Sequence, residues 1–146
     1  LPIATAAGAH AVVNYRAGNS AAMILEATGG ARINRIIEVE FGGNLAVSNA
    51  VLAPGGVIAA YGSMAEPSPQ LPFYSMMFQH LTLRMMLVYL LSPSERAAVI
   101  QRSTRALEAD VLTHNIAARF GLAETADAHC AVESGTLIGN AVILMD

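Results

Sequence analysis

Short apolar runs rich in β-branched residues alternate along the chain with segments whose apolar positions recur at helical spacing. The apolar runs predict strands at residues 11–15, 33–39, 57–61, 83–91, 116–120 and 141–145. Between them, capping residues and terminal glycines or prolines predict helices at residues 4–9, 19–28, 44–53, 92–110 and 122–133. Residues 65–72 hold three prolines and are expected to be a loop, and residues 73–80 a short helix or an irregular turn.

The helix at residues 92–110 has the clearest start signal. Ser92-Pro93-Ser94-Glu95 is a capping box with proline at the first helical position. The apolar side chains of Val99, Ile100, Ala106 and Leu107 are expected on one face of this helix.

Apolar strands that alternate with helical crossovers are typical of an α/β fold with a parallel sheet and helices on both faces. In such sheets, ligands bind beyond the carboxyl ends of the strands. Those ends lie here at Asn14-Tyr15, at residues 40–43, at residues 61–63 and at residues 88–90.

Composition narrows the class of protein. Of the 146 residues, 54% are hydrophobic and 13% are charged, and the net charge is −3, which excludes a disordered chain and disfavours a nucleic-acid partner. The longest apolar run, Met85 to Leu91, is shorter than the roughly 18 residues that a membrane span needs. No signal peptide is evident at the start, and Cys130 is the single cysteine. We therefore expect a cytoplasmic protein with no membrane partner, in which Cys130 is buried and inert.

Several kinds of catalytic chemistry have no support in the sequence. All eight cations are arginines, so Schiff-base chemistry and a P-loop lysine are excluded within this chain. The four histidines share no metal-binding spacing, and no G-x-S-x-G elbow occurs. We expect neither a metal nor a protein nucleophile.

A series of short segments carries a family resemblance. VVNYR at residues 12–16, LEATGG at 25–30, LAPGG at 52–56 and YG at 61–62 are followed by LAETADAH at 122–129, ESG at 133–135 and GNAV at 139–142. In this order and spacing they resemble the carboxyl-terminal half of a medium-chain dehydrogenase/reductase. The most similar branch is that of the zinc-independent NAD(P)H:quinone oxidoreductases, the zeta-crystallin-like group.

The resemblance implies that residues 1–146 are a partial Rossmann nucleotide-binding domain. The glycine-rich phosphate fingerprint G-x-G-x-x-G does not occur in the chain. The first strands with that loop and the amino-terminal catalytic domain are expected to be absent, so the strand at 11–15 would lack its usual neighbours. The cofactor of the parent protein would be NADPH or NADH. The parent would transfer hydride to a quinone or to an activated alkene or ketone, whereas the isolated chain is expected to be inactive and to bind cofactor weakly.

The same resemblance implies a set of cofactor-binding residues at the strand ends. Tyr15 would lie at the adenosine phosphate end, and Tyr61-Gly62-Ser63 beside the nicotinamide ribose. Glu40 departs from the family pattern, because a carboxylate repels phosphates. Acceptance of a ribose hydroxyl is one alternative for it, but we expect it to form a salt bridge or to face solvent. Asn140 stands where the family has a lysine. The full set is Asn14, Tyr15, Phe41, Gly42, Tyr61, Gly62, Ser63, Val88, Tyr89 and Asn140.

Two partners are expected for the parent protein. One is a small-molecule substrate. The other is a second copy of the chain, bound through the strand Leu83–Leu91, because a long apolar strand left as a free edge is an aggregation hazard. Two alternative functions stay open at this point. One is a non-catalytic structural or dimerisation module, and the other is part of a zinc alcohol dehydrogenase or an enoyl reductase of the same superfamily.

Overall fold

A computed structural model describes residues 2–112 and 114–145 of the chain. The chain divides into two compact units, Leu1–Ala97 and Ala98–Asp146, which we call the first and the second unit. Helix α5 (Pro93–Glu108) spans the boundary between them.

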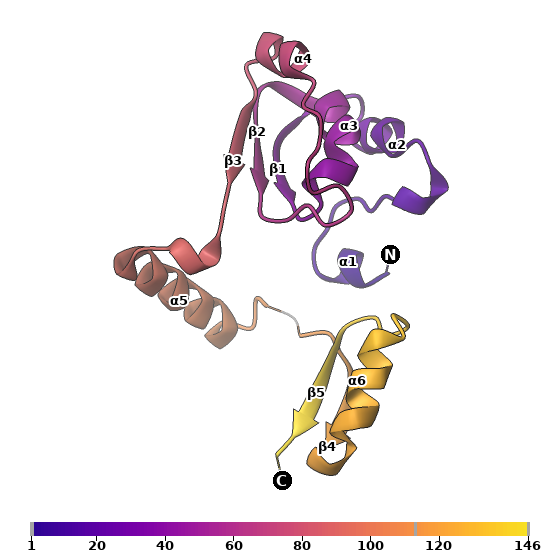
Figure 1. The fold of residues 1–146 in the computed structure, drawn as a ribbon, viewed down its shortest axis with the longest axis vertical. Helices are drawn as coiled ribbons and strands as arrows, with labels where there is room; N and C mark the ends of the chain where they lie inside the picture. The colour runs from indigo at the N-terminus through magenta and orange to yellow at the C-terminus, as the bar shows by residue number, and fades with distance from the viewer. Residues whose placement is uncertain (1, 113, 146) are drawn as a thin grey trace. The chain divides into compact units, whose positions relative to one another are not determined.

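The first unit is built on a three-stranded parallel sheet in the order β1-β2-β3 (Figure 1). The strands are β1 (Ile33–Glu38), β2 (Leu52–Ala60) and β3 (Thr82–Met85), with α3 (Phe41–Val51) in the first connection and α4 (Phe73–Phe78) in the second. Glu38 pairs with Ala60, and Ala60 with Met85. The carboxyl ends of all three strands therefore meet at one edge of the sheet.

The core of the first unit lies between this sheet and α3. Phe41 and Leu45 of α3 are buried against Leu52 and Ile58 of β2, and Ile36 of β1 packs on the cluster. Helix α2 (Ser20–Ala27) lies beside α3 (Figure 1). The next residue of β1, Ile37, is 71% exposed, because successive side chains of a strand point to opposite faces.

The predicted strand at residues 11–15 is wrong. Helix α1 (Pro2–Ala6) is followed by irregular backbone at residues 11–14 and then by the short 3-10 turn η1 (Tyr15–Ala17). A strand needs a neighbour for its N–H and C=O groups. In the described part of the chain, β1 pairs only with β2, so no neighbour is available to this segment.

The predicted strand at residues 83–91 is shorter than expected. Strand β3 ends at Met85, and Val88–Leu90 form the 3-10 turn η2. The reason is the length of the neighbouring strand β2, which ends at Ala60. The Ala60 carbonyl accepts a hydrogen bond from Met86 N–H at 2.8 Å, at the end of the pairing between the two strands.

Helix α3 begins three residues before its predicted start, at Phe41 instead of Asn44. Glu40 is its N-cap and accepts a hydrogen bond from Gly43 N–H. Because this side chain satisfies an N–H group of the first turn, the helix includes Gly42 and Gly43. It also ends before the predicted Ala53, and β2 begins at Leu52 instead of Val57.

The second unit contains two parallel strands, β4 (Ile116–Gly121) and β5 (Asn140–Leu144). They are connected through the 3-10 turn η3 (Leu122–Glu124) and α6 (Thr125–Glu133), which packs on both strands. This agrees with the predicted strand, helix and strand. Cys130 of α6 is exposed, so the expectation that it is buried is wrong. It points outward because Ala128 is the residue that α6 buries.

The capping box at the start of α5 is confirmed. Ser92 N–H donates to Glu95 Oε2 at 2.9 Å, and Glu95 N–H donates to Ser92 Oγ at 3.3 Å. Val99, Ile100 and Leu107 of its predicted apolar face are exposed. Within residues 2–112 and 114–145, no helix has the length and apolar character that crossing a membrane requires.

Candidate functional site

Two backbone hydrogen bonds join the carboxyl ends of β1 and β2. Tyr61 N–H donates to the Glu38 carbonyl at 3.0 Å, and Phe41 N–H donates to the Gly62 carbonyl at 2.9 Å. Gly62 lies so close to the end of β1 that a Cβ there would be 2.4 Å from the Val39 carbonyl oxygen. Only glycine allows this approach, which brings Tyr61 and Ser63 to the edge of the sheet.

A cavity of about 350 Å³ opens at this edge, and we call it the carboxyl-edge cavity. It gathers Phe41, Tyr61, Gly62 and Ser63, which the sequence analysis selected from two separate segments. The other lining residues are apolar or proline and come from β2, from the 67–71 loop and from the end of β3. The complete lining is Phe41, Ala60, Tyr61, Gly62, Ser63, Pro67, Pro69, Leu71, Met85 and Met86.

Gly42 lies next to this cavity and packs against the loop that follows β2. Its N–H donates to Ser63 Oγ at 2.9 Å, and the Ser63 hydroxyl donates to the Glu66 carbonyl at 2.5 Å. A Cβ at Gly42 would lie 2.2 Å from that carbonyl oxygen. In this structure, the loop occupies the space above Gly42.

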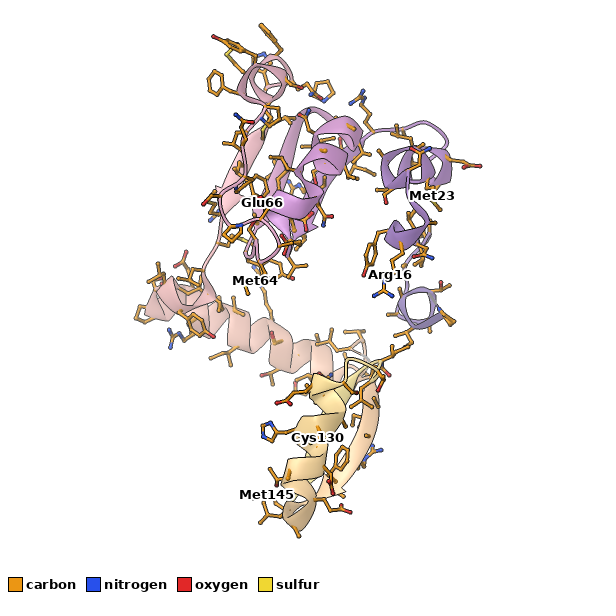
Figure 2. All side chains as sticks on the ribbon, turned by 45° about the vertical axis from the view of Figure 1, so that its right-hand side comes forward. Arg16, Met23, Met64, Glu66, Cys130 and Met145 are labelled. Carbon is orange, nitrogen blue, oxygen red and sulfur yellow. The ribbon has the colours of Figure 1, made fainter. Side chains whose placement is uncertain are left out.

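The sequence analysis expected Glu40 to form a salt bridge or to face solvent, but its carboxylate accepts three backbone hydrogen bonds. Its Oε2 accepts N–H bonds from Met64 at 2.8 Å and from Ala65 at 3.0 Å, and its Oε1 accepts one from Gly43 at 3.4 Å. Met64 and Glu66 mark this loop in Figure 2. The Ala65 N–H holds the pKa of Glu40 below its usual range, desolvation opposes this effect, and the Met64 and Gly43 N–H groups add to it.

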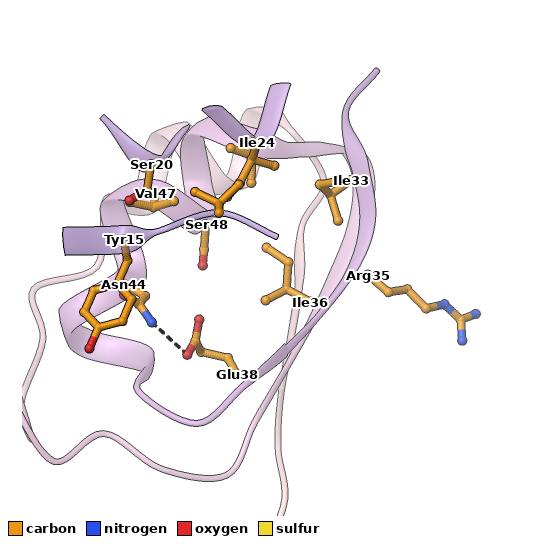
Figure 3. A pocket seen from close by; sticks show the side chains of 12 residues that line it. Tyr15, Ser20, Ile24, Ile33, Arg35, Ile36, Glu38, Asn44, Val47 and Ser48 are labelled. Carbon is orange, nitrogen blue, oxygen red and sulfur yellow. Dashed lines mark hydrogen bonds between the residues drawn. The ribbon is translucent and has the colours of Figure 1, made fainter. Parts of the chain in front are cut away.

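Tyr15 lines a different cavity, also of about 350 Å³, between α2, α3 and β1 (Figure 3). Glu38 reaches into it and is only 7% exposed. Glu38 Oε1 accepts hydrogen bonds from Asn44 Nδ2 at 3.0 Å and from Glu40 N–H at 2.8 Å. Arg35 is a lining residue, but its guanidinium points away from the cavity in Figure 3.

The predicted pair Asn14-Tyr15 is engaged locally with Arg16. The Asn14 side chain accepts the Arg16 N–H at 3.1 Å, as the cap of η1. The Arg16 guanidinium lies 5.8 Å from the centre of the Tyr15 ring. Tyr15 itself is 72% exposed.

Five predicted residues line neither cavity: Asn14 and Gly42, described above, and Val88, Tyr89 and Asn140. Val88 and Tyr89 are exposed in η2, beyond the end of β3. Asn140 is the first residue of β5, in the second unit, and its N–H donates to the Asn115 carbonyl at 2.8 Å.

The sequence analysis did not select Met85 and Met86 as site residues, but both line the carboxyl-edge cavity. Their position at the carboxyl end of a predicted strand was the available signal, because ligands bind at that edge of a parallel sheet.

Comparisons with known proteins agree with this architecture. The family model described as "Zinc-binding dehydrogenase" matches residues 7–143. No curated relative matches the chain.

Three solved structures illustrate the fold. An NAD-dependent alcohol dehydrogenase shares 21% identity and a TM-score of 0.77 over 100% of the chain. A quinone oxidoreductase from Pseudomonas syringae pv. Tomato DC3000 matches 97% of the chain, with 16% sequence identity and a TM-score of 0.77. A 2-haloacrylate reductase matches 95% of the chain, with 26% sequence identity and a TM-score of 0.79. The chain spans only 41%, 45% and 44% of these proteins, respectively.

These matches agree with the medium-chain dehydrogenase/reductase resemblance and with the parallel α/β fold. The family model covers the segments that carried the resemblance, from the VVNYR segment to the GNAV segment. The chain belongs to the zinc-binding dehydrogenase family.

Proposed function

We propose that the chain forms part of the nicotinamide-binding site of an NAD(P)H-dependent oxidoreductase. The parent enzyme would transfer hydride to a quinone or to an activated alkene or ketone. The observation that carries this proposal is the carboxyl-edge cavity, where Phe41, Tyr61, Gly62 and Ser63 meet at the ends of parallel strands. Membership of the zinc-binding dehydrogenase family supports a nicotinamide cofactor, and so does the structural similarity to an NAD-dependent alcohol dehydrogenase.

The lining residues fit the nicotinamide end of such a cofactor. When bound, the nicotinamide supplies the hydride. Phe41, Leu71, Met85 and Met86 give the cavity an apolar wall that excludes water from an uncharged ring. The Tyr61 hydroxyl and the Gly62 backbone offer polar groups to a ribose or a carboxamide, at the edge where a ligand is expected.

Ser63 positions the loop in this proposal and is not a free proton donor. Its hydroxyl already donates to the Glu66 carbonyl, and its oxygen accepts the Gly42 N–H. The cavity residues therefore bind and orient the ligand, while the hydride comes from the cofactor. This fits a quinone or activated-alkene reductase, which needs no protein nucleophile.

Zinc does not fit the residues that the structure describes in this chain, although the family description includes it. Within residues 2–112 and 114–145, no three His, Cys, Asp or Glu side chains lie close enough together to hold a metal ion. The described residues therefore offer no zinc site, and no step through zinc is proposed for them.

A second copy of the chain is the partner that we propose, bound through the segment from β3 to η2. β3 is the edge strand of the sheet, and the residues after it are apolar and exposed. For the intact enzyme we propose a cytoplasmic location, in keeping with the single, unpaired cysteine.

Titration of the chain with NADH and NADPH tests the proposed function. We expect weak binding, with the largest amide NMR shifts at Gly62 and Ser63. Tyr61→Ala should weaken that binding several-fold. Tyr74→Ala removes another exposed tyrosine, on α4, and should leave it unchanged. If neither nucleotide shifts Gly62 or Ser63, or if both variants bind equally well, the carboxyl-edge cavity is not the nicotinamide site.

A further inference from the structure

The carboxylate of Glu40 joins two segments that are distant in the sequence. One is the first turn of α3, which donates the Gly43 N–H, and the other is the loop after β2, which donates the N–H groups of Met64 and Ala65. Hydrogen bonds to an ionised acceptor are roughly twice as strong as neutral ones. The three donors converge on one side chain, so the Glu40 carboxylate connects the helix to the loop.

The loop that Glu40 holds forms one wall of the carboxyl-edge cavity. Ser63 comes directly before the two bonded amides, and Pro67 and Pro69 follow them, and all three line the cavity. Gly42 allows the loop to pack directly on the helix, because a side chain there would collide with the Glu66 carbonyl. The position of the wall thus depends on the contacts of the 63–66 segment with α3.

Both carboxylate oxygens of Glu40 are already engaged, so the side chain has a role other than direct contact with a ligand. We propose that Glu40 is a positioning residue, whose charge fixes the 63–66 segment and so sets the shape of the carboxyl-edge cavity. The part of this inference that concerns nucleotide binding rests on the proposed function. The part that concerns the loop stands on the hydrogen bonds alone.

Amide hydrogen exchange on the full chain measures how firmly Glu40 holds the 63–66 segment. NADH titration measures the effect of that segment on nucleotide binding. In Glu40→Ala, we expect exchange at Met64 and Ala65 to be roughly tenfold faster, because hydrogen bonds to a charged group are lost, and NADH binding to be several-fold weaker. Added formate, a small carboxylate, should partly restore both. Glu66→Ala is the matched control and should change neither, since among the described residues the Glu66 carboxylate accepts a hydrogen bond only from the nearby Ser68 N–H.

Glu40→Gln keeps the length of the side chain and removes its charge, so it serves if the alanine variant fails to fold. It should also speed exchange at the Met64 and Ala65 N–H groups. Formate should not restore slow exchange in this variant, because the glutamine side chain occupies the space that formate would need.

The inference is overturned if exchange at Met64 and Ala65 is unchanged in the variants, if formate has no effect on Glu40→Ala, or if that variant binds NADH as well as the unaltered chain does. A chain that binds no NADH, but whose loop amides respond to Glu40→Ala and to formate, retains the positioning role of Glu40 and loses the proposed function.

Discussion

Gly42 and Gly43 are neighbours in the first turn of α3, but their surroundings differ. A Cβ at Gly42 would lie 2.2 Å from the Glu66 carbonyl oxygen, which belongs to the backbone and has little freedom to move. A Cβ at Gly43 would meet Glu40 Cγ at 3.3 Å, which belongs to a flexible side chain. The same substitution therefore has a different expected result at each position.

Gly42→Ala should lower the free energy of unfolding by about 1–3 kcal/mol, the usual cost of overpacking. Gly43→Ala should change it by less than about 1 kcal/mol, because the contact is relieved more easily and alanine favours the helix. Urea denaturation of the two variants measures the difference. Equal destabilisation of both would contradict the packing of the loop on Gly42.

At the scale of the element, α5 is defined by its first turn. The Ser92 hydroxyl donates to Glu95 Oε2 at 2.6 Å, in addition to the two backbone bonds of the capping box. The Ser92 hydroxyl, followed by the Ser92 N–H, lowers the pKa of Glu95, with a further contribution from the Arg84 charge. The ionised form of Glu95 is therefore the one that caps the helix.

Acidification should loosen the start of α5. A group whose pKa is lowered by folding stabilises the folded state above its unfolded pKa, about 4.3 for glutamate, and loses that effect as the pH falls through the lowered value. Amide exchange in the first turn should therefore rise relative to the rest of α5 below that pH. Ser92→Ala should speed it roughly three- to tenfold at neutral pH, and Ser103→Ala, in the middle of the same helix, should not. A first turn insensitive to both pH and Ser92→Ala would contradict this account.

At the scale of the whole molecule, the proposed self-association depends on the apolar segment after β3. Leu87, Val88 and Leu90 are exposed, and the neighbouring β3 is an edge strand. The double change Leu87→Lys and Val88→Lys should shift sedimentation from dimer to monomer at a given concentration, because edge lysines oppose strand pairing. Ile138→Lys changes an exposed apolar residue of the second unit and should not. A monomer at all concentrations, or loss of the dimer in the control alone, would refute this contact.

Local residue patterns were sufficient to predict the elements with strong signals at their ends. The capping box at Ser92 and Glu95 and the helix that ends before Gly29 form where predicted. Helix α6 forms within the predicted range 122–133 but begins at Thr125, after the 3-10 turn η3. The parallel arrangement also followed from apolar strands alternating with helices. These features depend on neighbours within a few residues, or on the apolar character of whole strands, and both are visible in the residue pattern.

The tertiary structure decided what depends on distant partners. Residues 11–15 have strand-like composition but no neighbour to pair with, and β3 stops where β2 ends. Of the predicted site, the sequence placed Phe41 and Tyr61 at strand ends, but only the fold brings them into one cavity with Met85. Glu40 shows the reason most clearly, because Met64 and Ala65, its hydrogen-bond donors, lie 24 and 25 residues away along the chain.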